Sequence, residues 1–175
     1  MTGFVNSGFW RFEWALKRKY AFGRAYKIAQ KYRSSKGKGD GVAYAFGETP
    51  LKTIRKIVEL VDIDPASDRF LELGSGIGRM SMFVAQSHGI PCLGMEGIPE
   101  FVATGNLICK RQRLRNCHFE EGDLFAQDWG GHSILYLMTT TFPPALLQRV
   151  NEKCRELAPG TRLITVTNPP RAMGL

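Results

Sequence analysis

The sequence lacks the cysteine and histidine patterns that build metal sites. Its four cysteines include no C-x-x-C pair, and its three histidines show no i, i+4 spacing. Structural zinc sites draw their ligands from such patterns, so we expect no bound metal. No secretory signal peptide is recognisable at the start of the sequence, so we interpret the cysteines as free thiols in packing roles. This predicts the cytoplasm or another reducing intracellular compartment.

Long apolar runs are also missing. No stretch reaches the roughly 18 apolar residues that a membrane-spanning helix needs, so a membrane role would be peripheral. The composition does suit a globular domain. A chain of 175 residues, 43% of them hydrophobic, can bury a substantial core without disulfides.

Acidic residues are scarce at the N-terminal end. The first 45 residues hold ten Lys and Arg against two Asp and Glu, whereas residues 46–175 hold fourteen of each. The whole net charge of +8 therefore lies at that end. A Ser-, Lys- and Gly-rich run at residues 34–41 has the composition of a flexible linker. We predict two parts: a basic helical arm with its linker over residues 1–41, and a neutral domain over 42–175.

The basic arm interleaves aromatic and cationic side chains over residues 9–38. At about 100° per residue, Phe9, Phe12, Leu16 and Tyr20 fall on one face of a helix. Three interpretations fit this pattern: an element that contacts nucleic acid or nucleoprotein, an amphipathic helix at a membrane surface, and a helix packed on the domain with its cations in solvent. The first two imply an anionic partner.

Helical and strand periodicities alternate through the rest of the chain. The pattern predicts helices at 50–61, 77–88, 99–114 and 144–157, and strands at 70–73, 90–95, 117–120, 133–138 and 162–167. Alternation of this kind predicts an α/β fold with a doubly wound, mostly parallel, Rossmann-like sheet.

The most informative segment is residues 69–79, R-F-L-E-L-G-S-G-I-G-R, where an apolar strand runs into a glycine-rich turn and then a helix. Gly74 permits a tight turn, while Gly76 and Gly78 permit close approach of the backbone to a ligand and to the sheet. The dinucleotide fingerprint G-x-G-x-x-G places its third glycine one position later. Glu72, which opens the motif E-x-G-x-G-x-G within this segment, suits a ligand that carries an ammonium group. The series resembles the start of class I S-adenosylmethionine methyltransferases.

Two later acidic residues stand where such a fold would use them. Glu96 closes the next strand, roughly 20 residues after the turn, where one carboxylate can accept both ribose hydroxyls. Asp123 follows the third strand, where the resemblance to class I methyltransferases implies a contact with the adenine amine. These sites, in this order along the chain, predict S-adenosyl-L-methionine as the cofactor.

A closer resemblance covers residues 44–170. F-G-E-T at 46–49, L-E-L-G-S-G-I-G at 71–78, E-G-D-L at 121–124 and G-T-R-L-I at 160–164 resemble segments of the disruptor-of-telomeric-silencing type of non-SET lysine methyltransferases and their bacterial relatives. The corresponding family segments are Y-G-E-T, V-D-L-G-S-G-V-G, R-G-D-F and G-x-R-I-V. The resemblance implies an enzyme that methylates lysine on a protein substrate.

The resemblance also implies a set of site residues. For the cofactor it selects Thr49, Glu72, Gly74, Ser75, Gly76, Gly78, Glu96, Asp123 and Leu124. The catalytic candidates are Phe142 and Tyr136, as walls of an apolar lysine channel, and Glu48, which would orient the amine or the cofactor. An apolar channel favours the neutral amine that attacks the methyl group. Phe46 and Trp129 are further wall candidates, and each of these aromatics is equally well explained as ordinary core.

Two departures from the family pattern keep other functions open. The family segment V-N-N-F-A-F is L-M-T-T-T-F here, so Met138 and Thr139 replace both asparagines. The sequence also ends about eight residues after the fifth predicted strand, which implies either a fragment without the last two strands or an open sheet edge. The alternatives are methylation of RNA or of a small molecule, and a non-catalytic module that binds the cofactor. N-P-P at 168–170 reads as a chain turn.

Overall fold

The computed structural model describes residues 7–36 and 45–169, with side chains from residue 11 onward in the first range. Most of the predicted linker, the side chain of Phe9, and Pro170 lie outside this description. Within the two described ranges no helix is long and apolar enough to cross a membrane. The same ranges hold no group of three or more His, Cys, Asp or Glu placed to bind a metal ion.

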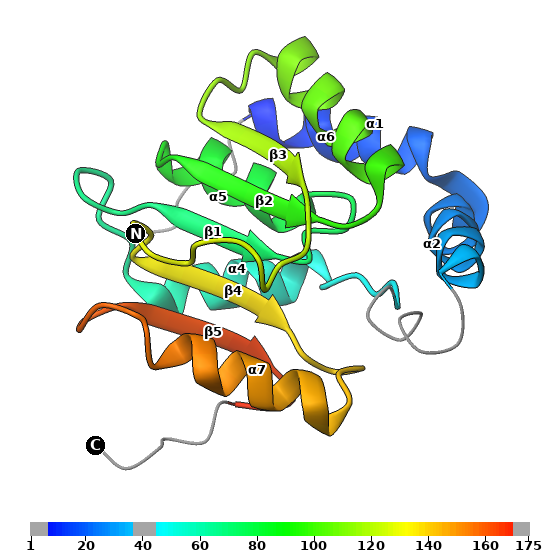
Figure 1. Ribbon diagram of the computed structural model, residues 1–175. Coiled ribbons are helices and arrows are strands. Elements are labelled where there is room, and N and C mark those ends of the chain that lie inside the picture. Colours follow the sequence, from blue (N-terminus) through cyan, green and yellow to red (C-terminus); the bar gives the residue numbers. More distant parts are fainter. Residues whose placement is uncertain (1–6, 37–44, 170–175) are drawn as a thin grey trace.

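The sheet has five strands, all parallel, in the order β3-β2-β1-β4-β5 (Figure 1). The strands are β1 (Phe70–Leu73), β2 (Cys92–Glu96), β3 (Cys117–Glu121), β4 (Ile134–Met138) and β5 (Arg162–Val166). The first strand, β1, lies at the centre of the sheet, with β2 and β3 added on one side of it. The chain then returns to add β4 and β5 on the other side of β1. The strand order reverses between β1 and β4, and the carboxyl ends there border a crevice. The predicted doubly wound parallel fold is confirmed.

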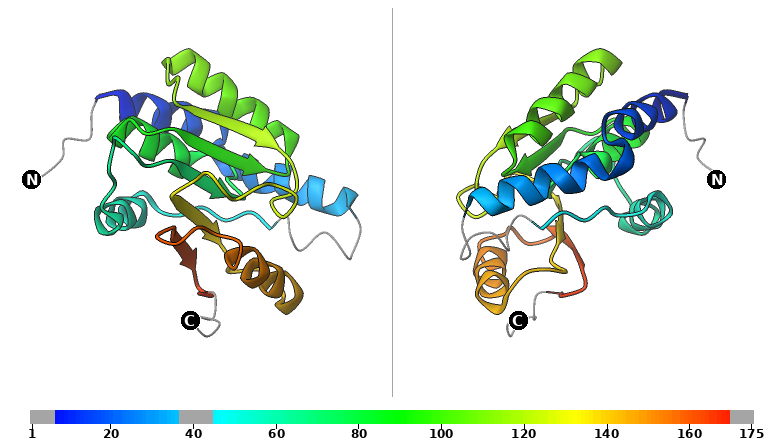
Figure 2. Two further views of the ribbon diagram at one scale, coloured as in Figure 1. Left: turned by 60° about the vertical axis from the view of Figure 1, so that its left-hand side comes forward. Right: turned by 90° about the vertical axis from the view of Figure 1, so that its right-hand side faces the viewer.

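Helices cover both faces of the sheet (Figure 2). They are α1 (Ser7–Lys19), the short η1 (Ala21–Gly23), α2 (Arg24–Ser35), α4 (Leu51–Val61), α5 (Arg79–His88), α6 (Pro99–Gln112) and α7 (Pro144–Cys154). Helices α1, α4, α5 and α6 share one apolar core with one face of the sheet. On the other face, α7 packs with the segment after β3 that contains Phe125 and Trp129.

The central strand β1 shows why one acidic residue in it matters. All four of its residues are buried, as expected for a parallel strand covered on both faces. Three of them are apolar, and the fourth is Glu72. The helix after the glycine turn begins at Arg79 rather than at the predicted residue 77, because Gly76 and Gly78 have positive φ angles of 54° and 80°. A right-handed helix does not accommodate that conformation.

Helix α1 is part of the core, which is the packed arrangement among the three interpretations of the basic arm. Phe12 and Leu16 are buried, and α1 packs against α5 and α6. Tyr20, at the end of α1, meets the ring of Phe101 edge-on with 5.6 Å between the centroids. The division of the chain near residue 41 stays a prediction, but α1 and the sheet share one core.

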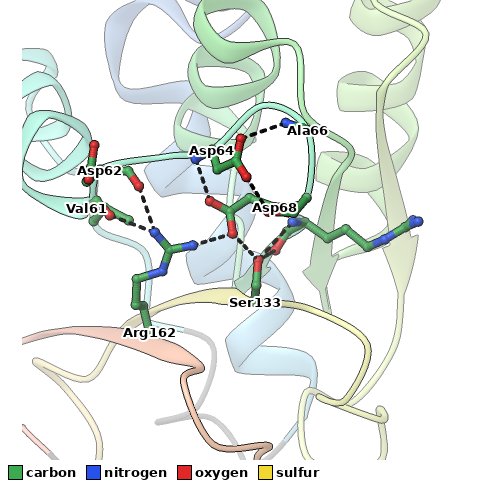
Figure 3. Close-up of polar contacts among 9 residues, drawn as sticks. Val61, Asp62, Asp64, Ala66, Asp68, Ser133 and Arg162 are labelled. Carbon is green, nitrogen blue, oxygen red and sulfur yellow. Dashed lines mark hydrogen bonds and ion pairs between the residues drawn. The ribbon is translucent and has the colours of Figure 1, made fainter.

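A polar cluster holds the edge strand β5 at the amino ends of the strands (Figure 3). Asp68 is buried and accepts hydrogen bonds from Ser133, from Arg162 and from the backbone N–H of Asp64. Arg162 also donates to the carbonyls of Val61 and Asp62. Burial opposes ionisation of Asp68, but the hydrogen bonds from Ser133 and Arg162 outweigh it and lower its pKa.

Candidate functional site

A cavity of about 710 Å³ opens at the carboxyl ends of β1, β2 and β4. Figure 1 shows these ends on one side of the molecule, where the chain before α4 also passes. Eleven of the twelve predicted site residues line this cavity: Glu48, Thr49, Glu72, Gly74, Ser75, Gly76, Glu96, Asp123, Leu124, Tyr136 and Phe142. The fold therefore collects residues spread over almost 100 positions of the sequence into one space.

Gly78 is not among the lining residues, and the structure gives it a packing role. A Cβ atom there would lie 2.3 Å from the ring of Phe119. The same ring would clash with a Cβ on Gly94 or Gly105. Phe119 thus packs among three glycines, one directly before α5 and the others in β2 and α6, which lets both helices approach the sheet closely. We attribute Gly78 to helix–sheet contact rather than to ligand contact.

The glycine turn forms the floor of the cavity. The N–H groups of Gly74 and Ser75 donate to the carbonyl of Met95 at 2.9 and 2.8 Å, which ties the turn to β2. Gly74 has a φ of 77°, a conformation that favours glycine. The Ser75 hydroxyl is buried and has no hydrogen-bond partner among the residues that the structure describes. A buried polar atom without a partner indicates a place for a ligand atom.

Glu72 is a buried carboxyl group at the cavity. One oxygen, Oε2, accepts from the backbone N–H of Ser81 at 2.9 Å and from its hydroxyl at 2.5 Å. Burial raises the pKa of Glu72 to about 8, although the two Ser81 contacts favour the carboxylate. A cationic group in the cavity would lower that pKa again, so the site is suited to a ligand with an ammonium group.

Glu96 stands at the end of β2 and is also buried. Its Oε2 accepts from the N–H of Gly76 at 2.6 Å, and its Oε1 accepts from the N–H of Ile98 at 2.9 Å. Burial raises its pKa, against the opposing effect of these hydrogen bonds. The contact with Gly76 fixes the carboxylate beside the glycine turn. Hydroxyl donors from a sugar would offset the cost of burying it.

The F-G-E-T segment lies over the glycine turn. The ring of Phe46 contacts Phe101, with 5.4 Å between centroids, and a Cβ on Gly76 would lie 3.3 Å from it. Thr49 Oγ1 and Tyr136 Oη are hydrogen-bonded at 2.6 Å, which links the segment to β4. Burial raises the pKa of Tyr136, so the phenol stays protonated at neutral pH.

Asp123 borders the outer part of the cavity and is mostly exposed. Its Oδ1 accepts from the N–H of Phe125 at 2.9 Å, a local turn that orients the carboxylate. Arg149 lies 3.9 Å from the other oxygen of Asp123 and stacks over the Phe125 ring at 4.0 Å. Sequence reasoning missed Arg149 as a lining residue, because only tertiary packing brings α7 to this edge.

The two residues that replace the family asparagines have different surroundings. Met138 lines the cavity, close to Gly47. Thr139 is fully buried, and its hydroxyl donates to the carbonyl of Val166 at 2.7 Å. Asn168 returns hydrogen bonds to Thr139 from both its backbone N–H and its side chain. Thr139 therefore joins the ends of β4 and β5 and is not among the residues that line the cavity.

Trp129 does not line the cavity. It is buried in the second core cluster, and its indole N–H donates to the carbonyl of Leu124 at 2.7 Å. Its core interpretation is therefore the correct one. Arg79 does line the cavity, directly after the glycine turn, and sequence reasoning did not assign it a role. The signal for it was its position, where the dinucleotide fingerprint has a glycine.

The order of the sheet and the arrangement of this cavity are those of class I S-adenosylmethionine-dependent methyltransferases. The model of one family, described as "Histone methylation protein DOT1", matches residues 28–171. The chain belongs to that family.

The solved structures include an RNA methyltransferase from Salinibacter ruber in complex with S-adenosyl-L-homocysteine. It is 29% identical, has a TM-score of 0.62, and the match covers 68% of this chain and 76% of that one. A methyltransferase from Thiobacillus denitrificans, also with S-adenosyl-L-homocysteine, has a TM-score of 0.61 at 16% identity, over 81% of this chain and 54% of that one. This second likeness shows the fold alone.

Two curated relatives carry names that state different methyl acceptors. A probable chloroplastic tocopherol O-methyltransferase from Oryza sativa subsp. japonica is 27% identical over 168 residues, 93% of this chain and 44% of that protein. A 23S rRNA (uracil(1939)-C(5))-methyltransferase from Nitrosococcus oceani is 33% identical over 82 residues, 47% of this chain and 18% of that protein. The chain thus spans less than half the length of these relatives.

Proposed function

We propose that this chain binds S-adenosylmethionine in the cavity and transfers its methyl group to a lysine of a protein. The observation that carries the proposal is the placement of the F-G-E-T segment over the glycine turn, with Thr49 bonded to Tyr136 at 2.6 Å. This segment resembles the Y-G-E-T loop of the lysine-methylating family, and it lines the cavity. The family match supports the same substrate class.

The residues present fit the cofactor. Glu72 and the Ser75 hydroxyl in the glycine turn would hold the amino acid part, Glu96 the ribose hydroxyls, and Asp123 the adenine amine. The buried Ser75 hydroxyl and the two buried carboxyl groups gain partners in this arrangement, which offsets their burial. When bound, the cofactor supplies a methyl group on a sulfonium centre that a nucleophile can displace.

The chain itself contributes position and an apolar environment. Tyr136, Met138 and Phe142 line the side of the cavity that β4 and the segment after it supply. Apolar walls disfavour the charged ammonium form of lysine and so favour the neutral amine that can attack. Alignment of two reactants in such a space is worth roughly 7 to 11 kcal/mol, so the site needs no strong general base. In this proposal Glu48, which lines the cavity, would orient the incoming amine.

Labelled methyl transfer tests this proposal. The protein is incubated with S-adenosylmethionine labelled in the methyl group and a whole-cell extract, and the products are treated with protease or with nuclease. Label released by protease alone supports the proposal. Binding of S-adenosylhomocysteine is measured in parallel by calorimetry. Binding without any incorporation would instead support a non-catalytic module, and absence of binding would refute the cofactor assignment.

RNA is the second candidate acceptor. The observation that favours it is the 29% identity to the Salinibacter ruber RNA methyltransferase over 68% of this chain, together with the partial match to rRNA methyltransferases. Release of the label by nuclease would decide for RNA.

The cationic surface of α1 and α2 would dock an anionic partner. Helix α2 carries Arg24, Lys27 and Lys31 on its exposed surface, and Lys36 beyond its end lines the cavity. A partner with phosphate or carboxylate groups would therefore meet positive charge beside the entrance. Binding to nucleic acid and to vesicles of anionic phospholipid, each measured at increasing salt, distinguishes the two sources of phosphate.

A further inference from the structure

Arg79 bridges two carboxylates that come from distant parts of the chain. Its Nε donates to Oε2 of Glu13 in α1 at 3.1 Å, and its Nη1 donates to Oε2 of Glu48. Glu48 belongs to the F-G-E-T segment, and both Arg79 and Glu48 line the cavity. One guanidinium group therefore connects α1 to the segment that covers the glycine turn.

The position of Arg79 calls for a specific reason. It is the first residue of α5, where the N-terminal end of the helix macrodipole disfavours a cation. Its side chain is only 16% exposed. The carboxylates of Glu13 and Glu48 offset the unfavourable helix dipole and the burial of the charge. The rigid guanidinium group holds these two carboxylates in defined directions. A lysine, which has a single ammonium group, would not reproduce this geometry.

Glu13 is buried in an otherwise cationic helix pair. It is the single acidic residue in the described range 7–36, and its side chain is 5% exposed. Its second oxygen lies 3.6 Å from Lys17. A buried carboxylate persists when cations compensate it, and here Arg79 supplies the closer contact. The Glu13 side chain therefore points toward Arg79, a residue that lines the cavity, rather than toward solvent.

The F-G-E-T segment is held at three points. Phe46 packs on Phe101, Thr49 bonds to Tyr136, and Glu48 lies between them on Arg79. The first two contacts fix the ends of the segment. The third sets the direction of the carboxylate that faces the cavity, and Glu13 keeps Arg79 in place from behind.

We propose that Glu13, acting through Arg79, positions Glu48 and its segment over the cofactor cavity, so that helix α1 is a working part of the methyl-transfer site. Glu13 and Arg79 are positioning residues in this account. The inference rests on the proposed function, because it takes the cavity as the cofactor site. It predicts that a change in α1, outside the cavity lining, weakens cofactor binding.

The test compares two ion pairs that α1 makes with the body of the protein. Glu13→Gln removes the charge behind Arg79. The control is Glu100→Gln. Glu100 is a residue of α6 that does not line the cavity, and its carboxylate lies 3.9 Å from the ammonium group of Lys19 in α1. We expect Glu13→Gln to weaken S-adenosylhomocysteine binding about tenfold by calorimetry, the scale of one charge-assisted hydrogen bond, and Glu100→Gln to leave it unchanged.

A double-mutant cycle separates positioning from stability. If Glu13 acts through Glu48, the affinity losses of Glu13→Gln and Glu48→Gln are not additive. If Glu13 only stabilises the fold, Glu13→Gln lowers the midpoint of thermal unfolding while the folded protein binds S-adenosylhomocysteine as wild type does, which overturns the inference. Should Glu13→Gln fail to fold, the cycle of Glu13→Asp with Glu48→Gln decides in the same way, since the shorter side chain keeps the charge but retracts it from Arg79. A wild-type protein that does not bind S-adenosylhomocysteine refutes the proposed function instead.

Discussion

At the scale of single residues, two carboxyl groups define the candidate site. Glu72 and Glu96 are buried in adjacent strands, and their hydrogen bonds come from backbone N–H groups and from the Ser81 hydroxyl. Burial without a paired cation is costly for a carboxylate. A ligand that brings an ammonium group to one and hydroxyl donors to the other would reduce that cost.

Glu96→Ala tests the ribose contact. We expect it to weaken S-adenosylhomocysteine binding by about 1 to 3 kcal/mol, the usual contribution of hydrogen bonds to a charged group. The matched control is Glu121→Ala, since Glu121 pairs with Glu96 in the register of β2 and β3 but is exposed. Calorimetry compares both variants with wild type. Equal affinity of Glu96→Ala and wild type would show that the site assignment is wrong.

The raised pKa of Glu72 predicts a dependence of stability on pH. Its pKa in the folded protein is about 8, against an ordinary value of 4.5. A carboxyl group with a raised pKa contributes stability at low pH that is lost as the pH rises through this range. The free energy of unfolding of the ligand-free protein should therefore fall between about pH 4.5 and pH 8 relative to that of Glu72→Gln. Parallel curves for the two proteins would exclude this role for Glu72.

At the scale of helices and strands, periodicity and glycine chemistry account for what the sequence could predict. The helix at 99–112 and the strands β1, β3 and β4 lie within one or two residues of the predicted ranges, because residue periodicity and signals at their ends, such as Pro99 and the glycine turn, mark them. The contact of Glu13 with Arg79 joins residues 66 positions apart. No local sequence pattern encodes such a contact. The sequence also could not decide among the three interpretations of the basic arm, because the same pattern of aromatic and cationic residues fits all of them.

Asp68→Asn tests the cluster that holds β5. It removes a charge that Arg162 and Ser133 bond to, so we expect a loss of about 1.5 to 3 kcal/mol in the free energy of unfolding by denaturant. The affinity for S-adenosylhomocysteine should not change, since the cluster lies at the amino ends of the strands. The control Glu59→Gln breaks an exposed pair with Lys56 and should cost almost nothing.

The lowered pKa of Asp68 adds a second signature of the same cluster. Its contribution to stability is present above the ordinary pKa of an aspartate and is lost as the pH falls through the lowered value. The difference in unfolding free energy between wild type and Asp68→Asn should therefore shrink on acidification. A difference that stays constant down to strongly acidic pH would contradict the role given to this carboxylate.

At the scale of the whole molecule, the positively charged helix α2 and the cavity lie on the same side. The exposed cations of α2 stand near the end of the sheet where the cavity opens, while the body carries balanced charge. Charge asymmetry of this kind steers an anionic partner toward one face. Helix α1 contributes Phe12 and Leu16 to the core, so substitutions on the surface test the docking role better than removal of the arm would.

Replacement of Arg24, Lys27 and Lys31 by Gln should reduce the slope of log affinity for an anionic partner against log salt, by up to about 0.9 for each cation that contacts a phosphate of duplex DNA. The same charge change on α4, with Lys52, Arg55 and Lys56 replaced by Gln, is the control. Affinity for S-adenosylhomocysteine should stay the same in both variants. An equal loss of partner binding in the two variants would mean that net charge alone, rather than the α2 surface, attracts the partner.

The central claim is methyl transfer from S-adenosylmethionine to a protein lysine. Its most direct test is amino-acid analysis of labelled protein after incubation with cell extract. The account predicts that the label elutes with methylated lysine after complete hydrolysis, and that Glu96→Ala reduces its amount. Label that elutes with a methylated nucleoside, or none despite measurable cofactor binding, would contradict it.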